Sequence, residues 1–255
     1  MQSGAYLDLA QVTLYVFWIF FAGLIFYLRR EDKREGYPLD SDGIGRGVVQ
    51  GFPRMPEPKS YLLRTGHVAT LPNHKNDRRD VALAPIAVWP GAPAEPTGNP
   101  MLDGVGPGSY ADREDIPELT MEDIPCIVPL RLAEGTYLEP RDPDPRGMQV
   151  LGADSEVGGV VTDVWVDRAE ALIRYLEVEV TTPQGARRVL LPQPFAKIDR
   201  NRRRVRVDAI LGSQFAAVPA TKSLDQVTKL EEDKIVGYYG AGTLYATPAR
   251  QEPLL

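Results

Sequence analysis

The chain begins with one long apolar run. Residues 9–28 read LAQVTLYVFWIFFAGLIFYL and carry no formal charge. At about 1.5 Å per residue, a helix of this length spans about 30 Å, the thickness of a bilayer's hydrocarbon core. A cleaved signal peptide needs a basic start and a small-residue cleavage site, and this stretch has neither. The pattern therefore predicts an uncleaved transmembrane helix.

The residues that flank this run predict its orientation. Residues 29–35 (RREDKRE) contain four Lys or Arg, whereas residues 1–8 contain none. Because basic residues favour the cytoplasmic side, we expect the amino terminus outside and the bulk of the chain in the cytoplasm. Ala22 and Gly23 beside large rings favour close packing on other helices, with a lone lipid-bathed anchor as the alternative.

A segment rich in glycine and proline follows the basic flank. Residues 36–110 contain 22 Gly and Pro in 75 residues, a density typical of linkers, yet they keep short apolar runs such as 81–89. We interpret residues 1–35 as a membrane anchor with its basic flank. Residues 36–110 are then an extended segment that lies over a partner surface, with a free linker as the alternative.

Residues 111–255 show the pattern of a mainly-β domain with a C-terminal helix. Short strand-like runs with short connections predict a small antiparallel β-barrel, closed or nearly closed, with a bulge or bend at Gly158 and Gly159. Thr228 and Glu231 form a capping-box pattern, so we expect a helix that begins there and ends at Gly240. The strand candidates are residues 126–132, 148–152, 157–166, 172–180, 187–192 and 204–210.

One strand candidate carries acids on a single face. In RYLEVEV, residues 174–180, alternation places Tyr175, Glu177 and Glu179 on one face and the aliphatic side chains on the other.

Composition narrows the classes of function. The 255 residues include 29 Lys and Arg against 35 acids, a net charge of −6, which argues against a general nucleic-acid binder. The single cysteine, Cys126, excludes an internal disulfide framework and a cysteine-rich zinc site, so we expect a buried structural thiol. Two histidines and the lack of H-E-x-x-H, G-x-S-x-G and Walker patterns argue against an anchored enzyme.

Two charged clusters are candidates for function. The basic run at residues 197–206 predicts a solvated hairpin turn or an electrostatic contact with anionic headgroups or an acidic partner, with RNA third. The second cluster contains Asp163, Asp167 and Glu170, with Arg174 close behind. Acids in turns are usually solvated. The alternative is a coupled carboxylate pair that holds a proton near neutral pH.

An ordered set of motifs gives the chain a family likeness. The motifs, in order, are YLRREDKREGYPL (27–39), EPTGNPM (95–101), DGVGPGSYA (103–111), DPRGMQV (144–150), TDVWVDR (162–168), RYLEVEV (174–180), VLLP (189–192), EEDKI (231–235) and LYATPAR (244–250). Together they resemble the H subunit of the purple-bacterial photosynthetic reaction centre, from about residue 6 to the end.

The resemblance implies a PRC-type barrel in a non-enzymatic subunit that itself binds no pigment, other cofactor or metal. In that family the H chain caps the L and M subunits, which carry bacteriochlorophyll, bacteriopheophytin, quinones and a non-haem iron. It also supplies part of the proton route to the secondary quinone. The resemblance further implies the bacterial inner, intracytoplasmic membrane, a periplasmic amino terminus, and a cytochrome subunit or light-harvesting antenna and membrane lipids as neighbours, without nucleic acid.

The resemblance also implies roles for individual residues. By position, Asp167, Glu170 and Arg174 match the family's interior acid–acid–arginine set on the proton route. The stretch that carries a histidine pair at the family's proton entrance reads TMEDI here, so Glu122 and Asp123 are either surface proton collectors or ordinary exposed acids. The rival interpretation is a membrane-tethered PRC-barrel adaptor that binds RNA or a ribosomal protein through residues 197–206.

Overall fold

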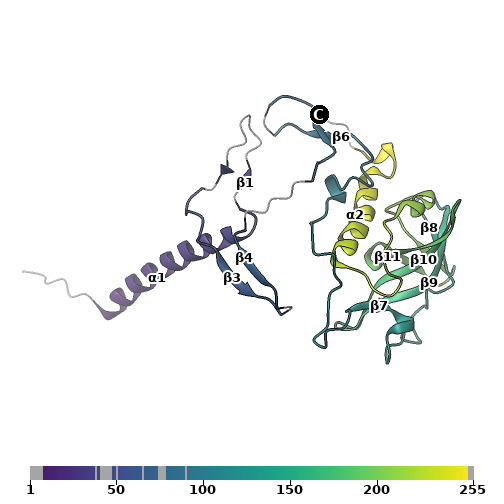
Figure 1. The fold of residues 1–255 in the computed structure, drawn as a ribbon, viewed down its shortest axis with the longest axis horizontal. Coiled ribbons are helices and arrows are strands. Elements are labelled where there is room, and N and C mark those ends of the chain that lie inside the picture. Colours follow the sequence, from purple (N-terminus) through teal and green to yellow (C-terminus); the bar gives the residue numbers. More distant parts are fainter. Residues whose placement is uncertain are drawn as a thin grey trace, which may run out of the picture. The chain divides into compact units, whose positions relative to one another are not determined.

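The computed structural model describes residues 8–37, 39–40, 48–49, 51–64, 66–73, 79–89 and 91–251. The chain divides into two compact units. The first consists of Met1–Arg78 with Ala87–Ala92 and contains the apolar helix. The second consists of Arg79–Ile86 with Pro93–Leu255 and contains the β-domain (Figure 1).

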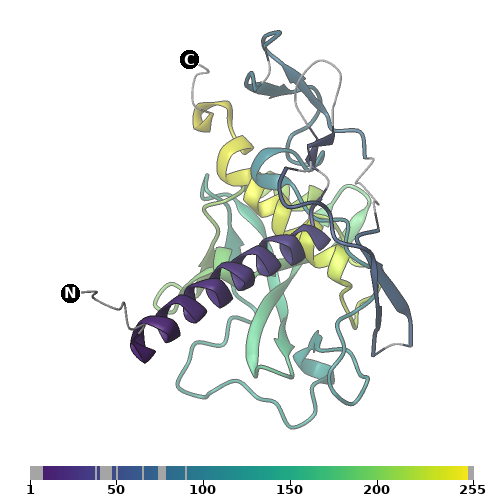
Figure 2. The ribbon, with the colours of Figure 1, turned by 90° about the vertical axis from the view of Figure 1, so that its left-hand side faces the viewer.

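The predicted apolar helix is present as α1, Leu9–Glu31, an uninterrupted helix in Figure 2. It begins at Asp8, whose carboxylate accepts a hydrogen bond from the Ala10 amide at 3.4 Å. None of its residues is buried. By length and composition the helix can cross a membrane, and a short 3-10 helix, η1 (Asp32–Arg34), continues it.

Of the four basic residues that follow the apolar run, Arg29 and Arg30 lie in the last turn of α1, whereas Lys33 and Arg34 in η1 are buried. Lys33 donates a hydrogen bond to the Pro53 carbonyl, and Arg34 donates to the carbonyls of Glu57 at 2.6 Å and Leu71 at 3.1 Å. These bonds attach the segment that follows to the end of the helix. Its strands in this unit form two antiparallel pairs, β1 (Leu39–Asp40) with β2 (Val48–Val49), and β3 (Lys59–Leu62) with β4 (Val68–Leu71).

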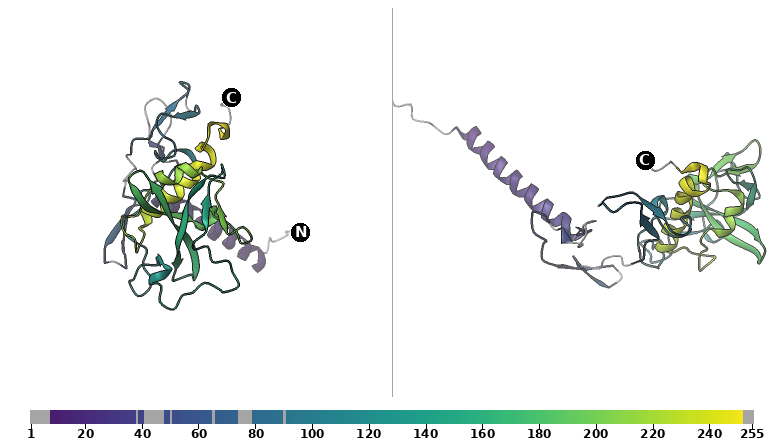
Figure 3. Two further views of the ribbon diagram at one scale, coloured as in Figure 1. Left: turned by 90° about the vertical axis from the view of Figure 1, so that its right-hand side faces the viewer. Right: turned by 90° about the horizontal axis from the view of Figure 1, so that it is seen from above.

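The second unit is organised around one seven-stranded sheet (Figures 1 and 3). All six predicted strands are present, and β12 is an additional one. The path runs β11-β10-β9-β8-β13-β12, and β7 pairs with β9. The strands are β7 (Ile127–Pro129), β8 (Gln149–Leu151), β9 (Val157–Asp167), β10 (Leu172–Thr182), β11 (Gly185–Pro192), β12 (Lys197–Asp199) and β13 (Arg204–Arg206).

The sheet departs from the predicted all-antiparallel pairing at one place. β13 pairs with β8 in parallel, and the chain passes through β9 to β12 before it reaches this edge of β8. The ladder ends at β11 and β12, and no pairing between these two strands joins its ends in the described part of the chain. The predicted bulge is confirmed: Val150 pairs with Gly159 and Leu151 with Val157, which leaves Gly158 as the extra residue.

Helix α2 (Lys229–Tyr245) covers part of this sheet and begins with the predicted capping box. The Thr228 hydroxyl accepts a hydrogen bond from the Glu231 amide at 3.2 Å, and the Glu231 carboxylate accepts one from the Thr228 amide at 2.9 Å. The largest fully buried side chains of the unit are Trp165, Tyr239, Phe215, Leu176, Leu191 and Ile210.

The prediction that α2 ends at Gly240 is wrong, since the helix continues to Tyr245. Glycine is needed inside it for close packing. A Cβ at Gly237 would lie 2.8 Å from the Gly108 carbonyl oxygen, and one at Gly240 would lie 2.6 Å from the Pro107 carbonyl oxygen.

The remaining elements of this unit are short. The strands β5 (Leu83–Pro85) and β6 (Ala94–Pro96) form an antiparallel pair. The 3-10 helices are η2 (Gly106–Gly108), η3 (Leu130–Leu132), η4 (Gln193–Phe195), η5 (Gly212–Ala217) and η6 (Pro248–Arg250).

Candidate functional site

The turn between β9 and β10 contains two of the predicted site residues. Asp167 ends β9 and is 7% exposed. Its Oδ1 atom accepts hydrogen bonds from the amides of Ala169 at 2.9 Å and Glu170 at 3.2 Å, which fixes the turn. Glu170 itself is exposed. The structure therefore places a buried and an exposed acid three residues apart, with the buried one held by backbone amides.

Arg174, the third predicted residue, is directed to a different partner. Its Nη2 atom lies 3.7 Å from Oε2 of Glu232, a residue of α2 that is 7% exposed. The Tyr175 hydroxyl donates a hydrogen bond of 2.7 Å to the same oxygen. The ion pair of Arg174 therefore joins β10 to α2, and Glu232 is a residue that sequence reasoning did not identify.

Glu232 lies in the wall of a pocket of about 320 Å³. Burial raises the pKa of the Glu232 carboxyl, although the Tyr175 hydrogen bond and the Arg174 charge act in the opposite direction. Burial and the nearby Glu232 charge also raise the pKa of Tyr175. The ionisable residues lining the pocket are Tyr110, Arg113, Glu118, Arg174, Tyr175, Glu232 and Asp233.

Asp163, the remaining acid of the predicted cluster, belongs to a separate ion cluster. Arg131 lies 3.1 Å from Asp163 and 3.1 Å from Glu177, which is only 1% exposed. Arg188 lies 3.3 Å from Glu177, and the Trp165 indole donates to it at 3.1 Å. These contacts neutralise two buried carboxylates inside the fold.

The proposed proton collectors lie in a surface turn. Glu122 and Asp123 are both exposed, and Asp123 has a φ of 60°. The Glu122 amide donates a hydrogen bond of 3.2 Å to the Thr120 hydroxyl. Both carboxylates are thus accessible to water. Glu118, which lines the pocket beside Glu232, precedes this turn.

The basic run at residues 197–206 forms the β12–β13 hairpin, as the solvated-turn interpretation predicts. Its charge is partly neutralised, since Lys197 at 2.6 Å and Arg206 at 2.7 Å both pair with Asp208. Arg204 lies 3.8 Å from Asp199.

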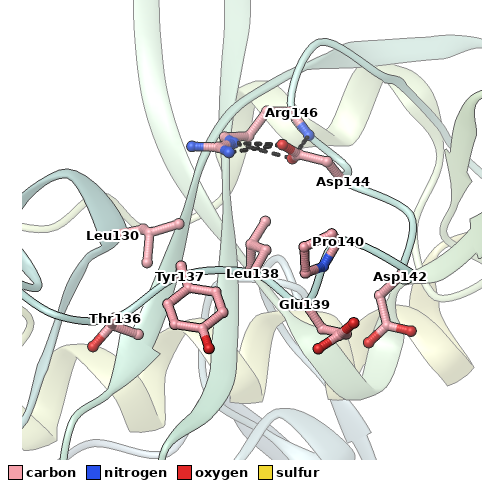
Figure 4. Close-up of a pocket in the computed structure, with 9 residues that line it drawn as sticks. All are labelled: Leu130, Thr136, Tyr137, Leu138, Glu139, Pro140, Asp142, Asp144 and Arg146. Atoms are coloured by element: carbon pink, nitrogen blue, oxygen red, sulfur yellow. Dashed lines mark hydrogen bonds and ion pairs between the residues drawn. The ribbon is translucent and has the colours of Figure 1, made fainter.

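A second, open pocket of about 420 Å³ is lined by Leu130 of η3 and by residues of the loop that connects η3 to β8 (Figure 4). Arg146 makes a short ion pair of 2.7 Å with Asp144, so Asp144 neutralises the charge of Arg146. Glu139 and Asp142 lie together on another side of the pocket, with Tyr137 beside the apolar wall (Figure 4). The exposed acids of this pocket form no organised site.

Cys126 is buried, as predicted, at 5% exposure. Burial, followed by the nearby charge of Asp167, raises the pKa of its thiol, which makes the reactive thiolate less accessible. Within the described part of the chain, no group of three or more His, Cys, Asp or Glu side chains is arranged to hold a metal ion.

Comparison with known families gives matches to two regions of the chain. Residues 139–214 match the PRC-barrel domain, so the sheet described above is a PRC-type barrel. Residues 2–132, about half of the chain, match the family described as the photosynthetic reaction centre, H-chain N-terminal region. The chain therefore belongs to the H-chain family of photosynthetic reaction centres, whose members are structural subunits rather than enzymes. The candidate membrane helix near the amino terminus fits a membrane-anchored subunit.

Proposed function

We propose that this chain caps the L and M subunits of a photosynthetic reaction centre on the cytoplasmic side and assists proton transfer to the secondary quinone. The family match and the candidate membrane span near the amino terminus support attachment to such a core. The pigments, quinones and non-haem iron belong to L and M in this proposal. The four basic residues after the apolar run support a periplasmic amino terminus in an inner membrane.

A proton route is needed because reducing a quinone to quinol consumes two protons. A quinone site shielded from bulk water receives them only through protonatable side chains and ordered water. The observation that carries the proposal is the β9–β10 turn, where exposed Glu170 lies beside buried Asp167 in positions that match the family's route. An exposed acid next to a buried one is suited to pass a proton inward along such a route.

The surroundings of this turn support a docking role. The Arg168 amide donates a hydrogen bond of 3.0 Å to the Cys126 carbonyl, which holds the segment before β7 against the turn. Large apolar side chains are exposed on both segments: Met121 at 83%, Ile124 at 43% and Leu172 at 40%. Such a group of exposed apolar side chains is typical of a surface that a partner covers.

The test is Glu170→Gln in the intact complex, with Glu179→Gln as the control, because Glu179 is an exposed acid of β10 outside the turn. We expect Glu170→Gln to slow proton-coupled reduction of the secondary quinone after flashes and to leave the first charge separation intact. Unchanged proton-uptake kinetics in Glu170→Gln would contradict the proton-route part of the proposal. Isolation of the native chain without pigment-bearing partners would contradict the capping part.

A further inference from the structure

The pocket between β10 and α2 contains a carboxyl group that the β9–β10 turn does not include. Glu232 is 7% exposed and is held from one side by the Tyr175 hydroxyl, at 2.7 Å, and by the Arg174 guanidinium, at 3.7 Å. Both partners come from β10, the strand that begins directly after the turn. Glu232 therefore contacts the first residues of β10, which directly follow the turn that contains Asp167 and Glu170.

The pocket is lined by both charged and apolar residues and is large enough for water. Its volume of about 320 Å³ corresponds to roughly ten times the share of liquid volume of one water molecule. The charged groups facing it are mixed in sign: Arg113 and Arg174 are basic, and Glu118 and Asp233 are acidic. Arg113 forms an ion pair of 3.4 Å with Asp233. Glu118 is the other acid beside Glu232 in the lining of this pocket.

The environment of Glu232 suits a group that binds and releases a proton. Burial favours its neutral form, while the Tyr175 hydrogen bond and the Arg174 charge stabilise its anion, so neither state is strongly excluded. The Tyr175 hydroxyl can donate its hydrogen bond to Glu232 in both the ionised and the neutral form, because a protonated carboxyl still accepts a hydrogen bond through its carbonyl oxygen. Proton exchange at Glu232 therefore requires little rearrangement.

We propose that this pocket is a proton entrance of the complex, at which the Glu232 carboxylate takes a proton from pocket water and releases it to the next water or carboxylate toward the β9–β10 turn. One O–H bond forms as another breaks, and no electron moves. The inference rests on the proposed proton route and adds a residue to it. The pocket would then be a second place of proton entry, in addition to the exposed acids Glu122 and Asp123.

The experiment uses the assembled complex with Glu232→Gln, Tyr175→Phe and the control Glu179→Gln. Flash-induced proton uptake is followed with a pH-indicator dye, and light-minus-dark infrared spectra are recorded in the carboxylic-acid carbonyl region. Because a positioned proton-transfer group contributes substantially to rate, we expect Glu232→Gln to slow uptake by about tenfold or more. It should also remove one carbonyl band. Tyr175→Phe should shift that band, and Glu179→Gln should match the wild type.

The outcomes separate this inference from the proposed function. If Glu170→Gln slows quinone reduction while Glu232→Gln leaves uptake and spectrum unchanged, the pocket entrance is wrong and the proton route stands. If Glu170→Gln is also without effect, the route itself is wrong. Should Glu232→Gln fail to assemble, Tyr175→Phe decides, since it keeps the carboxyl and the aromatic ring: an unshifted carbonyl band together with unchanged uptake overturns the inference.

Discussion

Arg131 lies 3.1 Å from Glu177 and, through the same guanidinium nitrogen, 3.1 Å from Asp163. Glu177 is 1% exposed, and Asp163 is 6% exposed. Arg131 comes from η3, at the end of the region that matches the H-chain N-terminal family, whereas both acids belong to the barrel strands. The guanidinium therefore ties the two family regions together through buried charge.

We expect Arg131→Met to destabilise the chain by about 3–5 kcal/mol, because among the described residues it leaves Asp163 without an ion pair and Glu177 with Arg188 alone. Arg141→Met is the matched control, since the Arg141 side chain is 94% exposed and should change stability by less than about 0.5 kcal/mol. Denaturant unfolding of the full chain in detergent measures both. Equal midpoints for the two variants would show that the cluster is not needed for stability.

Gly237→Ala should also destabilise the chain, although alanine favours helices over glycine by about 1 kcal/mol. A Cβ at this position would lie 2.8 Å from the Gly108 carbonyl oxygen, so α2 or η2 must shift. Overpacking of this kind typically costs about 1–3 kcal/mol, which exceeds the gain in propensity.

The control for this variant is Thr243→Ala, an exposed position on the same helix, where we expect little change. A higher unfolding midpoint for Gly237→Ala than for the wild type would contradict the role of close packing.

The sequence pattern predicts the strands of the barrel well, but it does not predict which other parts of the chain pack over them. Alternation along β10 places Tyr175, Glu177 and Glu179 on one face, yet it does not reveal that Tyr175 and Glu177 are buried whereas Glu179 is exposed. Tyr175 is covered by α2 through Glu232, and Glu177 is covered by Arg131. Glu232 and Arg131, which cover these side chains, come from distant parts of the chain, and the local alternation of β10 contains no information about them.

The candidate site shows the same limit. Asp167 and Glu170 are detectable because acids at the end of a strand followed by a second strand mark a turn. Glu232 is 57 residues from its partner Tyr175 and lies in a run that reads simply as the charged start of a helix. The burial that raises the pKa of Glu232 arises only when α2 packs on β10. A sequence pattern therefore finds the turn but not the pocket.

Two adjacent tyrosines of α2 provide a matched pair of variants. Tyr238 donates a hydrogen bond of 2.8 Å to the Gln214 carbonyl, whereas the hydroxyl of Tyr239, 0% exposed, has no hydrogen-bond partner among the described residues. We expect Tyr238→Phe to lose about 1 kcal/mol of stability. Tyr239→Phe should keep or slightly raise stability, because it removes a buried hydroxyl without a protein partner.

Thermal unfolding of both variants, compared with the wild type, provides the measurement. A loss in Tyr239→Phe as large as that in Tyr238→Phe would indicate that a bound water molecule satisfies the Tyr239 hydroxyl.

The raised pKa of Glu232 predicts a pH dependence of stability that Glu232→Gln should remove. A carboxyl that holds its proton more tightly when folded stabilises the fold most at low pH, where both states are protonated. As the pH rises from the ordinary pKa of 4.5 toward the raised value, the unfolded chain releases this proton first, so the Glu232 contribution falls. Asp115 and Asp208, whose pKa values are lowered by hydrogen bonds from Lys222 and Lys197, change stability in the opposite direction.

The difference between the unfolding free energies of the wild type and Glu232→Gln isolates the Glu232 contribution, because the other carboxyls are common to both chains. We expect this difference to decrease above pH 4.5 and then to become constant once Glu232 is ionised in the folded state. Glu179→Gln, an exposed position on β10, should give a flat difference. A flat curve for Glu232→Gln as well would mean that packing of α2 on β10 leaves this carboxyl as solvated as it is in the unfolded chain.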